Sequence, residues 1–396
     1  MPPIPPPPPP PPHIGILINN GAQFANGSEQ QPQFLIEVLK YLGVPFTVYT
    51  HVGTENMNGT SRDPTFHGTS MQLLTGADLS HVSVFIMICH IVDDTRDASV
   101  LCERLSHAKV VQFHCGNHCY FNAEDVVFGG HNVVRMLMNS WITESWVFDM
   151  HSFASTYYQF LTNKPCRVMP YVWSPTLLDT YTVKNQLVIE CDIQLYGHED
   201  TPLVLCCFEP NLNMTKTCLA PLLIMDAFYR RAPHRVHKCF IFCAEHLRKR
   251  SAFQDFLRFL KLSADGKIEL YPRMPIPNAL HQMRERRLAP VIVSHQIANA
   301  QNYLALELLH LGYPFIHNCE WMQSAGFFYH EWALRGAVDA IDTLHGSFVQ
   351  RNDLYLAKAR AVLQQCHPSH VSNLAQFRRL LTVSRTSSTK LVAEAS

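Results

Sequence analysis

The sequence carries little charge and no excess of either sign. Lys plus Arg and Asp plus Glu number 32 each in 396 residues, so the formal net charge is zero and charged residues make up 16%. Proteins that bind nucleic acid or an anionic membrane are typically basic, and this balance supports neither class. Apolar residues make up 47%, which is typical of a folded globular chain and not of a disordered one.

Long apolar runs are also missing, because no run approaches the roughly 18 residues that a membrane-spanning helix needs. The longest, residues 82–92, is interrupted by His90 and predicts a buried strand. The N-terminal proline tract lacks a charged leader and a cleavable apolar core, so no signal peptide is expected. The 13 cysteines are odd in number and irregularly spaced, which favours reduced thiols and a cytoplasmic protein.

A chain of this length exceeds what one hydrophobic core usually serves, so two domains are expected. Residues 1–12 predict a solvated, disordered proline-rich leader. Residues 13–170 and 171–365 are the expected N-terminal and C-terminal domains, and residues 366–384 an expected closing helix. The Ser/Thr-rich tail at residues 385–396 is expected to be disordered.

Both halves alternate apolar strands with amphipathic helices, the pattern of a parallel α/β sheet. In the first half we expect strands at 14–18, 44–49, 82–89 and 109–113, a Gly/Asn-rich loop at 19–31, and helices at 33–42 and 98–106. In the second half we expect strands at 203–208, 236–242, 268–270 and 290–294, helices at 217–229, 251–260, 280–287 and 300–311, and a helical region at 353–381. The predicted fold class is α/β, with two Rossmann-like doubly wound domains facing a cleft. Ligands bind such folds at the carboxyl ends of the strands.

Glu307 stands out in the second half. It lies on a predicted helix that ends at Gly312 and Pro314, just before an apolar strand. A carboxylate on a helix directed at the carboxyl edge of a parallel sheet suits a ribose, because both ribose hydroxyls can donate to it. The alternative is an amphipathic helix on which Glu307 is merely solvated.

Four segments in the same order, VMPYVWSP, FEPNLNMTKTC, SHQIANAQNYLALELLHLGYPFIHN and AGFFY, carry a family resemblance. The second half resembles the donor domain of GT-B-type glycosyltransferases, in particular the retaining family-four type. Residues 13–381 also resemble an uncharacterised glycosyltransferase-like group from bacteria and large DNA viruses. The resemblance implies transfer of a sugar from a nucleotide-sugar donor to a carbohydrate or glycoconjugate acceptor. It implies retention of configuration and no metal or other cofactor, and no nucleic-acid partner is expected.

The resemblance assigns residues one by one. Glu307 falls where the pattern has its ribose-binding acid, and Lys216 where a lysine reaches the diphosphate; the alternative for Lys216 is a solvated first-turn lysine. Asn211 stands in place of an arginine and Asn299 in place of an acid. These two changes favour the alternative of a catalytically degenerate binding or structural protein with the same fold. A nucleotide-sugar epimerase of GT-B architecture is a third possibility.

Two further residues are assigned to the donor site. His295 follows a buried strand, so it is expected at the cleft, where it could contact the nucleotide. The alternative is a buried histidine whose hydrogen bonds are all made within the core. Asn302 lies in the same segment.

The first domain offers candidate loops at its own strand ends. Gly21, Asn26 and Gly27 belong to a Gly-rich loop that matches the phosphate and acceptor loop of such enzymes. Glycines allow close approach of a ligand, although an ordinary strand-to-helix turn is the alternative.

His114 and Asn117 lie in the segment HCGNHC, which we interpret as a cleft loop where they could contact acceptor or donor, and His114 is a candidate catalytic residue. A zinc site is the alternative, but no second pair of ligands is evident. Asp149 and His151 are candidates for a general base, and the sequence does not choose between them.

Overall fold

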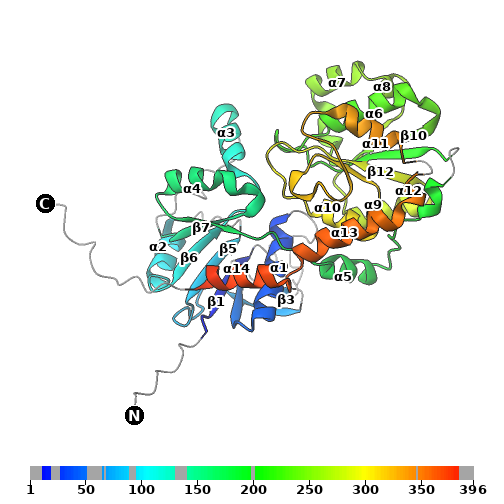
Figure 1. Ribbon diagram of the computed structural model, residues 1–396. Coiled ribbons are helices and arrows are strands. Elements are labelled where there is room, and N and C mark those ends of the chain that lie inside the picture. The colour runs from blue at the N-terminus through cyan, green and yellow to red at the C-terminus, as the bar shows by residue number, and fades with distance from the viewer. Residues whose placement is uncertain are drawn as a thin grey trace, which may run out of the picture.

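The computed structural model describes residues 11–18, 27–50, 65–66, 68–88, 95–129, 141–197, 201–344 and 347–382. These residues form two lobes, each built on its own sheet (Figure 1).

The first sheet has eight strands in the order β3-β4-β2-β1-β5-β6-β7-β8. They are β1 (Ile14–Ile18), β2 (Phe46–Thr50), β3 (Thr65–Phe66), β4 (Thr69–Leu73), β5 (Val84–Ile88), β6 (Lys109–Phe113), β7 (Glu144–Phe148) and β8 (Cys166–Met169). The short edge strand β3 is antiparallel to β4, and the other pairings are parallel. Every residue of β1 and β5 is buried, because helices cover both faces of a doubly wound sheet.

The helices of the first domain are α1 (Gly27–Leu42), α2 (Thr95–Arg104), α3 (His118–Phe128), the 3-10 helix η2 (Asp149–Ala154) and α4 (Ser155–Thr162). The loop expected over residues 19–31 was wrong at its end, because Gln30 and Gln31 are helical. Helix α1 begins five residues before Pro32, which lies inside it.

The second sheet has six parallel strands in the order β11-β10-β9-β12-β13-β14. They are β9 (Leu203–Cys207), β10 (Val236–Ile241), β11 (Ile268–Leu270), β12 (Ala289–Val293), β13 (Phe315–His317) and β14 (Phe327–Phe328). This is the 3-2-1-4-5-6 order of a Rossmann sheet. Without β3 the first sheet has the same order, with β8 added as a seventh strand at the far edge. The expected pair of Rossmann-like domains is confirmed.

The helices of the second domain are α5 (Thr176–Lys184), η3 (Ile193–Tyr196), α6 (Leu219–Arg231), η4 (Pro233–Arg235), η5 (Glu245–Lys249), α7 (Ser251–Arg258), α8 (Lys261–Ala264), α9 (Ile276–Glu285), α10 (Tyr303–Leu311), η6 (Glu320–Met322), α11 (Leu334–Asp342), α12 (Ser347–Gln350) and α13 (Asn352–Cys366). Two expected helix starts were too early: α6 begins at Leu219 and not at 217, and α10 at Tyr303 and not at 300. The polar residues before each start form loops. Asn302, for example, has the extended backbone of an N-cap, with φ −152° and ψ 99°. Among the described residues no helix has the length and apolarity that crossing a membrane requires.

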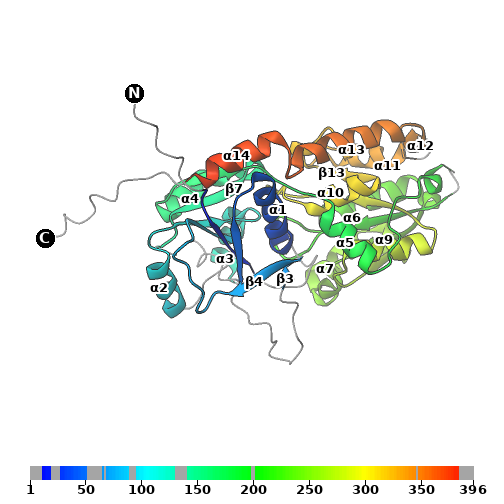
Figure 2. The same cartoon turned by 90° about the horizontal axis from the view of Figure 1, so that it is seen from below.

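The helical region expected over 353–381 is two helices, α13 and α14 (Val371–Leu381), separated at Pro368. Helix α14 returns to the first domain, and in Figure 2 the two helices follow one edge of the molecule. Lys109 Nζ donates to Leu380 O at 2.6 Å, and Gln376 Nε2 donates to Val168 O at 3.1 Å. The C-terminal segment therefore ties the two domains together.

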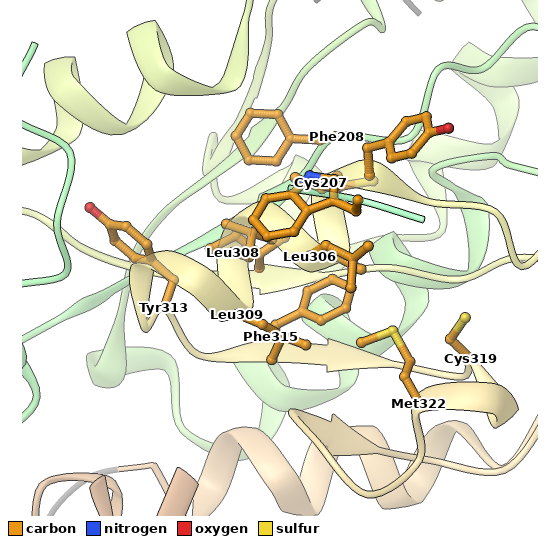
Figure 3. Packing of buried hydrophobic residues seen from close by; sticks show 14 of the residues in the cluster. Cys207, Phe208, Leu306, Leu308, Leu309, Tyr313, Phe315, Cys319 and Met322 are labelled. Carbon is orange, nitrogen blue, oxygen red and sulfur yellow. The ribbon is translucent and has the colours of Figure 1, made fainter. Parts of the chain in front are cut away.

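The core of the second domain forms between α10 and the sheet. Figure 3 shows Leu306, Leu308 and Leu309 of α10 beside Phe315 of β13. All four side chains are at most 1% exposed. This packing fixes the helix that carries Glu307 against the central strands.

Phe315→Ala should lower the free energy of unfolding by about 3 to 5 kcal/mol, because it removes a fully buried ring and leaves a cavity. Phe259 is 80% exposed, so Phe259→Ala is the matched control and should cost less than about 0.5 kcal/mol. Urea denaturation of both variants measures the difference. Equal losses would contradict the packing described for α10 and β13.

Candidate functional site

Two loops meet at the carboxyl edge of the second sheet. They follow the neighbouring strands β9 and β12. From β9 the chain continues to β10 on one side of this pair, and from β12 it continues to β13 on the other. Rossmann folds bind ligands where the strand order reverses in this way. Ile297 N donates to Thr215 O at 2.8 Å, and Asn299 Nδ2 donates to Thr215 Oγ1 at 3.2 Å. The ammonium of Lys216 donates to the carbonyl of Gln301. These bonds hold Lys216 and Asn299, both predicted site residues, side by side.

Glu209 is a further polar residue of this crevice, and the sequence analysis did not assign it a role. It is 2% exposed and accepts hydrogen bonds from the Ser294 hydroxyl and from His295 N, the latter at 3.3 Å. Burial raises the pKa of Glu209, and the Lys216 ammonium partly offsets that rise. The sequence signal that could have identified Glu209 is its position, because its carboxylate lies two residues after a buried strand.

Lys216, in the loop after β9, is partly buried. Burial lowers the pKa of its ammonium, while the carboxylate of Glu209 raises it. The two groups therefore stabilise each other's charge. A cation positioned three residues before the first residue of α6 suits an anionic ligand.

Asn211, which stands where the resemblance implies an arginine, shapes the loop itself. Its backbone is left-handed, with φ 54°. Its Nδ2 donates to Glu209 O at 2.8 Å, and its Oδ1 accepts from Cys218 N at 2.7 Å. Because both polar atoms of the side chain bind backbone, Asn211 supports the conformation that presents Lys216.

His295 and Asn302 lie at the same edge. His295 is 3% exposed, its Nδ1 lies 3.0 Å from the Tyr329 hydroxyl, and its ring centroid lies 4.4 Å from that of Trp332. Burial lowers the pKa of His295 to about 4, so the ring is neutral at pH 7. In the described part of the chain its Nε2 has no hydrogen-bond partner. Asn302 is only partly buried and is the N-cap residue of α10.

Glu307 is covered by the first domain. It is 3% exposed, and its Oε1 accepts from Nε2 of Gln30 on α1 at 3.4 Å. Next to it the Tyr303 hydroxyl donates to Oε1 of Gln31. The alternative of a solvated Glu307 was therefore wrong. Burial raises its pKa from 4.5 to about 7.

The loop after β6 closes the crevice from the first domain. Nδ2 of Asn117 donates to Ala298 O at 2.7 Å, across the domain boundary. Gly116 has a left-handed backbone, with φ 85°, and a Cβ there would lie 3.6 Å from Asn299 Oδ1. Glycine permits this left-handed conformation. The structure thus brings Asn117 and Asn299 together.

His114 lies deeper in the first domain. Its side chain is fully buried, its Nε2 is 3.3 Å from Ser145 Oγ, and its ring stacks on Tyr158 with centroids 4.4 Å apart. Burial lowers its pKa well below the usual value. His114 therefore supports the loop that carries Asn117.

His151, by contrast, is near the donor loops. It is 1% exposed on η2, and neither ring nitrogen has a hydrogen-bond partner among the described residues. Burial lowers its pKa to about 3, and the positive charge of Lys216 contributes to that lowering. Asp149, two residues earlier, keeps part of its surface exposed, and partial burial of the carboxyl raises its pKa.

Some predicted positions are outside this description. Gly21 and Asn26 lie beyond the described residues. Gly27 is the first residue of α1, so it belongs to a helix end and not to a loop. Among the described residues, Glu320, His330 and Glu331 lie close enough together to hold a metal ion. All three are exposed.

Solved structures share this two-domain fold. They include a glycosyltransferase from Rickettsia africae ESF-5, with TM-score 0.51 and 14% identity, covering 94% of this chain and 98% of that one. The alpha,alpha-trehalose 6-phosphate synthase from Burkholderia multivorans has TM-score 0.54 and 12% identity, with coverages of 94% and 100%. A structure from E. coli described as trehalose-6-phosphate bound with UDP-2-fluoro glucose has TM-score 0.53 and 11% identity, with coverages of 93% and 98%. At these identities the likeness shows the GT-B fold.

Sequence comparison gives a second finding. The profile of the family described as "Protein of unknown function (DUF2827)" matches residues 13–381. No curated protein matches the sequence.

Glu307→Gln should change how stability depends on pH. Because burial raises the pKa of Glu307 from 4.5 to about 7, the folded protein binds this proton more tightly than the unfolded chain. The tighter protonation contributes on the order of 3 kcal/mol to the free energy of unfolding. That contribution is fully present below about pH 4.5 and is lost as the pH rises through about 7. Glutamine does not titrate, so the variant should gain stability relative to wild type across that window.

Urea denaturation at several pH values between about 4.5 and 8 measures this difference. Glu285→Gln, at an exposed glutamate, is the control and should follow wild type. A Glu307→Gln difference that does not vary with pH would show that the carboxyl is not buried as described.

Proposed function

The chain belongs to the DUF2827 family, and we propose that it is a glycosyltransferase that moves a sugar from a nucleotide-sugar donor to a carbohydrate or glycoconjugate acceptor. The observation that carries the proposal is the contact between loops of the two domains at the carboxyl ends of their Rossmann sheets. There Asn117 of the first domain donates to the carbonyl of Ala298 in the second at 2.7 Å, in the segment that also holds Lys216. The GT-B fold and a similar structure described with UDP-2-fluoro glucose support it.

In this proposal Lys216 binds the donor diphosphate. Its ammonium exchanges the carbonyl of Gln301 for a phosphate oxygen, which is a stronger, charge-assisted partner. Charge develops on the diphosphate as the sugar leaves, and a pre-positioned cation in a dry site stabilises that charge. Because Lys216 supplies this positive charge, the proposed mechanism requires no metal ion at the diphosphate.

Glu307 binds the donor ribose in this proposal, which requires the domains to separate first. The carboxylate now accepts one long hydrogen bond from Gln30, and two ribose hydroxyls would replace it with two donors. Opening and closing of domains around substrates is common in enzymes that must exclude water. The segments that cross between the domains, joined by the 2.9 Å bond from Trp173 N to Cys366 O, are the natural hinge.

His151 and Asp149 have different roles here. A pKa of about 3 makes His151 a weak base, so we assign it hydrogen bonding to the transferred sugar. We expect retention of configuration, because the Glu307 segment resembles the retaining branch, and in such a transfer the leaving diphosphate oxygen takes the proton of the acceptor hydroxyl. An inverting transfer would need a general base, and Asp149, whose carboxyl has a raised pKa, is the better candidate for that role.

Nucleotide binding tests the donor site. Wild-type protein should be stabilised by one of UDP, GDP, ADP, dTDP and CDP, by about 2.7 kcal/mol at 100 times the dissociation constant, which is a few degrees in melting temperature. Lys216→Met should abolish that shift. Lys249→Met, at an exposed lysine, is the matched control and should retain it. No shift with any of the five nucleotides would overturn the proposal.

Turnover tests the catalytic face. Release of nucleoside diphosphate from the matching nucleotide sugar should fall by roughly a hundredfold in His151→Ala, while the affinity for the bare nucleoside diphosphate stays the same. A coupled assay for the released nucleotide measures the rate. Full activity in His151→Ala would remove His151 from the site.

A further inference from the structure

A cavity of about 600 Å³ lies where α13 meets α14, beside the segments that cross between the two domains (Figure 2). It is lined by Trp173 and Pro175 of one crossing segment, by His310 of α10, by the end of α13 and by the segment that leads into α14. Small-molecule sites typically have volumes of roughly 300 to 1,000 Å³. None of the described residues that we assign to the donor lines this cavity, so it is a separate candidate site.

The ionisable side chains that line the cavity are all of basic type. They are Arg360, His310, His367 and His370, and in the described part of the chain no carboxylate lines the cavity. A guanidinium is charged at any physiological pH. The Asp179 carboxylate lies 3.8 Å from His310 Nε2, but it is mostly exposed to water, which screens its charge. This composition favours an anionic ligand.

His367 offers a hydrogen-bond donor to the cavity. Ser369 N donates to Nδ1 of His367 at 3.2 Å, so Nδ1 accepts, and in the uncharged ring the hydrogen is on Nε2. The Ser369 hydroxyl also lies 2.7 Å from this Nδ1. The acceptor of a neutral His367 is therefore occupied, and the remaining polar group of its ring is an N–H donor.

The first turn of α14 supplies further donors, beginning at Val371, which lines the cavity. Leu374 N donates to His370 O at 3.0 Å, and the N–H groups of the helix before Leu374 have no acceptor within it. The N-cap residue His370 makes no side-chain cap hydrogen bond to them. An anion placed here would accept from these groups and meet the positive end of the helix dipole.

The carbonyl groups at the end of α13, by contrast, are already occupied. Gln364 O accepts from His367 N at 3.2 Å, and Cys366 O accepts from Trp173 N at 2.9 Å. Carbonyl oxygens that accept in this way are less available to repel an anion. The polar part of the cavity therefore consists mainly of donors, which is the complement of an oxyanion.

We propose that this cavity binds a phosphate monoester of a small organic molecule and that the bound ligand is an effector of the donor site. A guanidinium, an imidazole N–H and the N–H groups of a helix N-terminus can all donate to phosphate oxygens. A phosphate monoester presents three such oxygens and a carboxylate only two, so the phosphate uses more of these donors. The phosphate fills a small part of the volume, and Trp173, Pro175 and Leu363 form an apolar wall for the organic part.

The position of the cavity connects it to the donor site. Helix α10 carries both His310, which lines the cavity, and Glu307, which Gln30 of the first domain holds at 3.4 Å. A ligand that bridges α10 and the two crossing segments stabilises this arrangement of the domains. The effector role rests on the proposed function, in which the domains must separate before a ribose can reach Glu307. The bound phosphate monoester should therefore weaken nucleotide binding.

Isothermal titration calorimetry with phenyl phosphate tests the cavity. Arg360→Gln should weaken its binding by about tenfold, because a charge-assisted hydrogen bond is lost. Arg378, also exposed but at the other end of α14, gives the matched control Arg378→Gln, which should bind like wild type. Lys216→Met should also bind like wild type. A loss of binding in Lys216→Met, with Arg360→Gln unchanged, would place the phosphate at the donor loops and overturn the inference.

Two further probes test the chemical class. Inorganic phosphate lacks the organic part and benzoate lacks the phosphate, so each should bind at least about fivefold more weakly than phenyl phosphate. Equal or tighter binding of benzoate would overturn the phosphate assignment, and equal or tighter binding of inorganic phosphate would overturn the role of the apolar wall. Absence of binding by all three probes in wild-type protein overturns the inference.

The effector role is tested by titrating the nucleoside diphosphate that stabilises the protein, with and without saturating phenyl phosphate. Its affinity should fall at least about fivefold in wild type, and the same phenyl phosphate concentration should have a much smaller effect in Arg360→Gln. An unchanged nucleotide affinity in wild type would overturn the effector role. If no nucleotide binds while phenyl phosphate still requires Arg360, the proposed function and the effector role fail and the phosphate site stands.

Discussion

The structure depends on the contact between helix α1 of the first domain and helix α10 of the second. Glu307 meets Gln30 there, and Tyr303 hydrogen-bonds Gln31, stacks on Tyr171 at 5.3 Å and lies 5.4 Å from Phe34 between ring centroids. A carboxyl group would not be buried at such an interface unless the aromatic packing offset its loss of hydration. This contact brings the carboxyl edges of both sheets together, and with them Lys216, His151 and Asn117.

The fold could be predicted because its signals are local. Apolar runs such as 203–208 and 290–294 coincide with β9 and β12 within a residue or so, since a parallel strand buried on both faces must be apolar throughout. Strand β7 and strand β8 were not predicted. Their sequences, ESWVF and CRVM, mix polar and apolar residues. The buried Glu144 is paired with Lys109 at 2.7 Å and also accepts from the Trp146 indole at 2.7 Å. That ion pair joins residues far apart in the chain and leaves no local pattern.

The positions of Lys216 after a strand and of Glu307 before Gly-x-Pro are readable in the sequence, and their roles at the donor stay predictions. The structure brings Lys216, Asn299 and His295 to one edge of the second sheet. Glu209 was missed, and so were the partners of Glu307. Gln30 is 277 positions from Glu307, and only the docking of two domains makes them neighbours. Asn211 was assigned to the donor, whereas its side chain caps the loop. A side chain's partner cannot be inferred from its own residue type when the partner is backbone.

The central claim is that the donor nucleotide occupies the crevice between Lys216 and Glu307 and displaces α1 from that carboxylate. A crystal structure of the chain with the nucleoside diphosphate that stabilises it tests this claim most directly. The account predicts diphosphate oxygens within hydrogen-bond distance of Lys216 Nζ, ribose hydroxyls on Glu307, and Gln30 withdrawn from it. A nucleotide bound elsewhere, with the Gln30–Glu307 contact intact, would contradict the account.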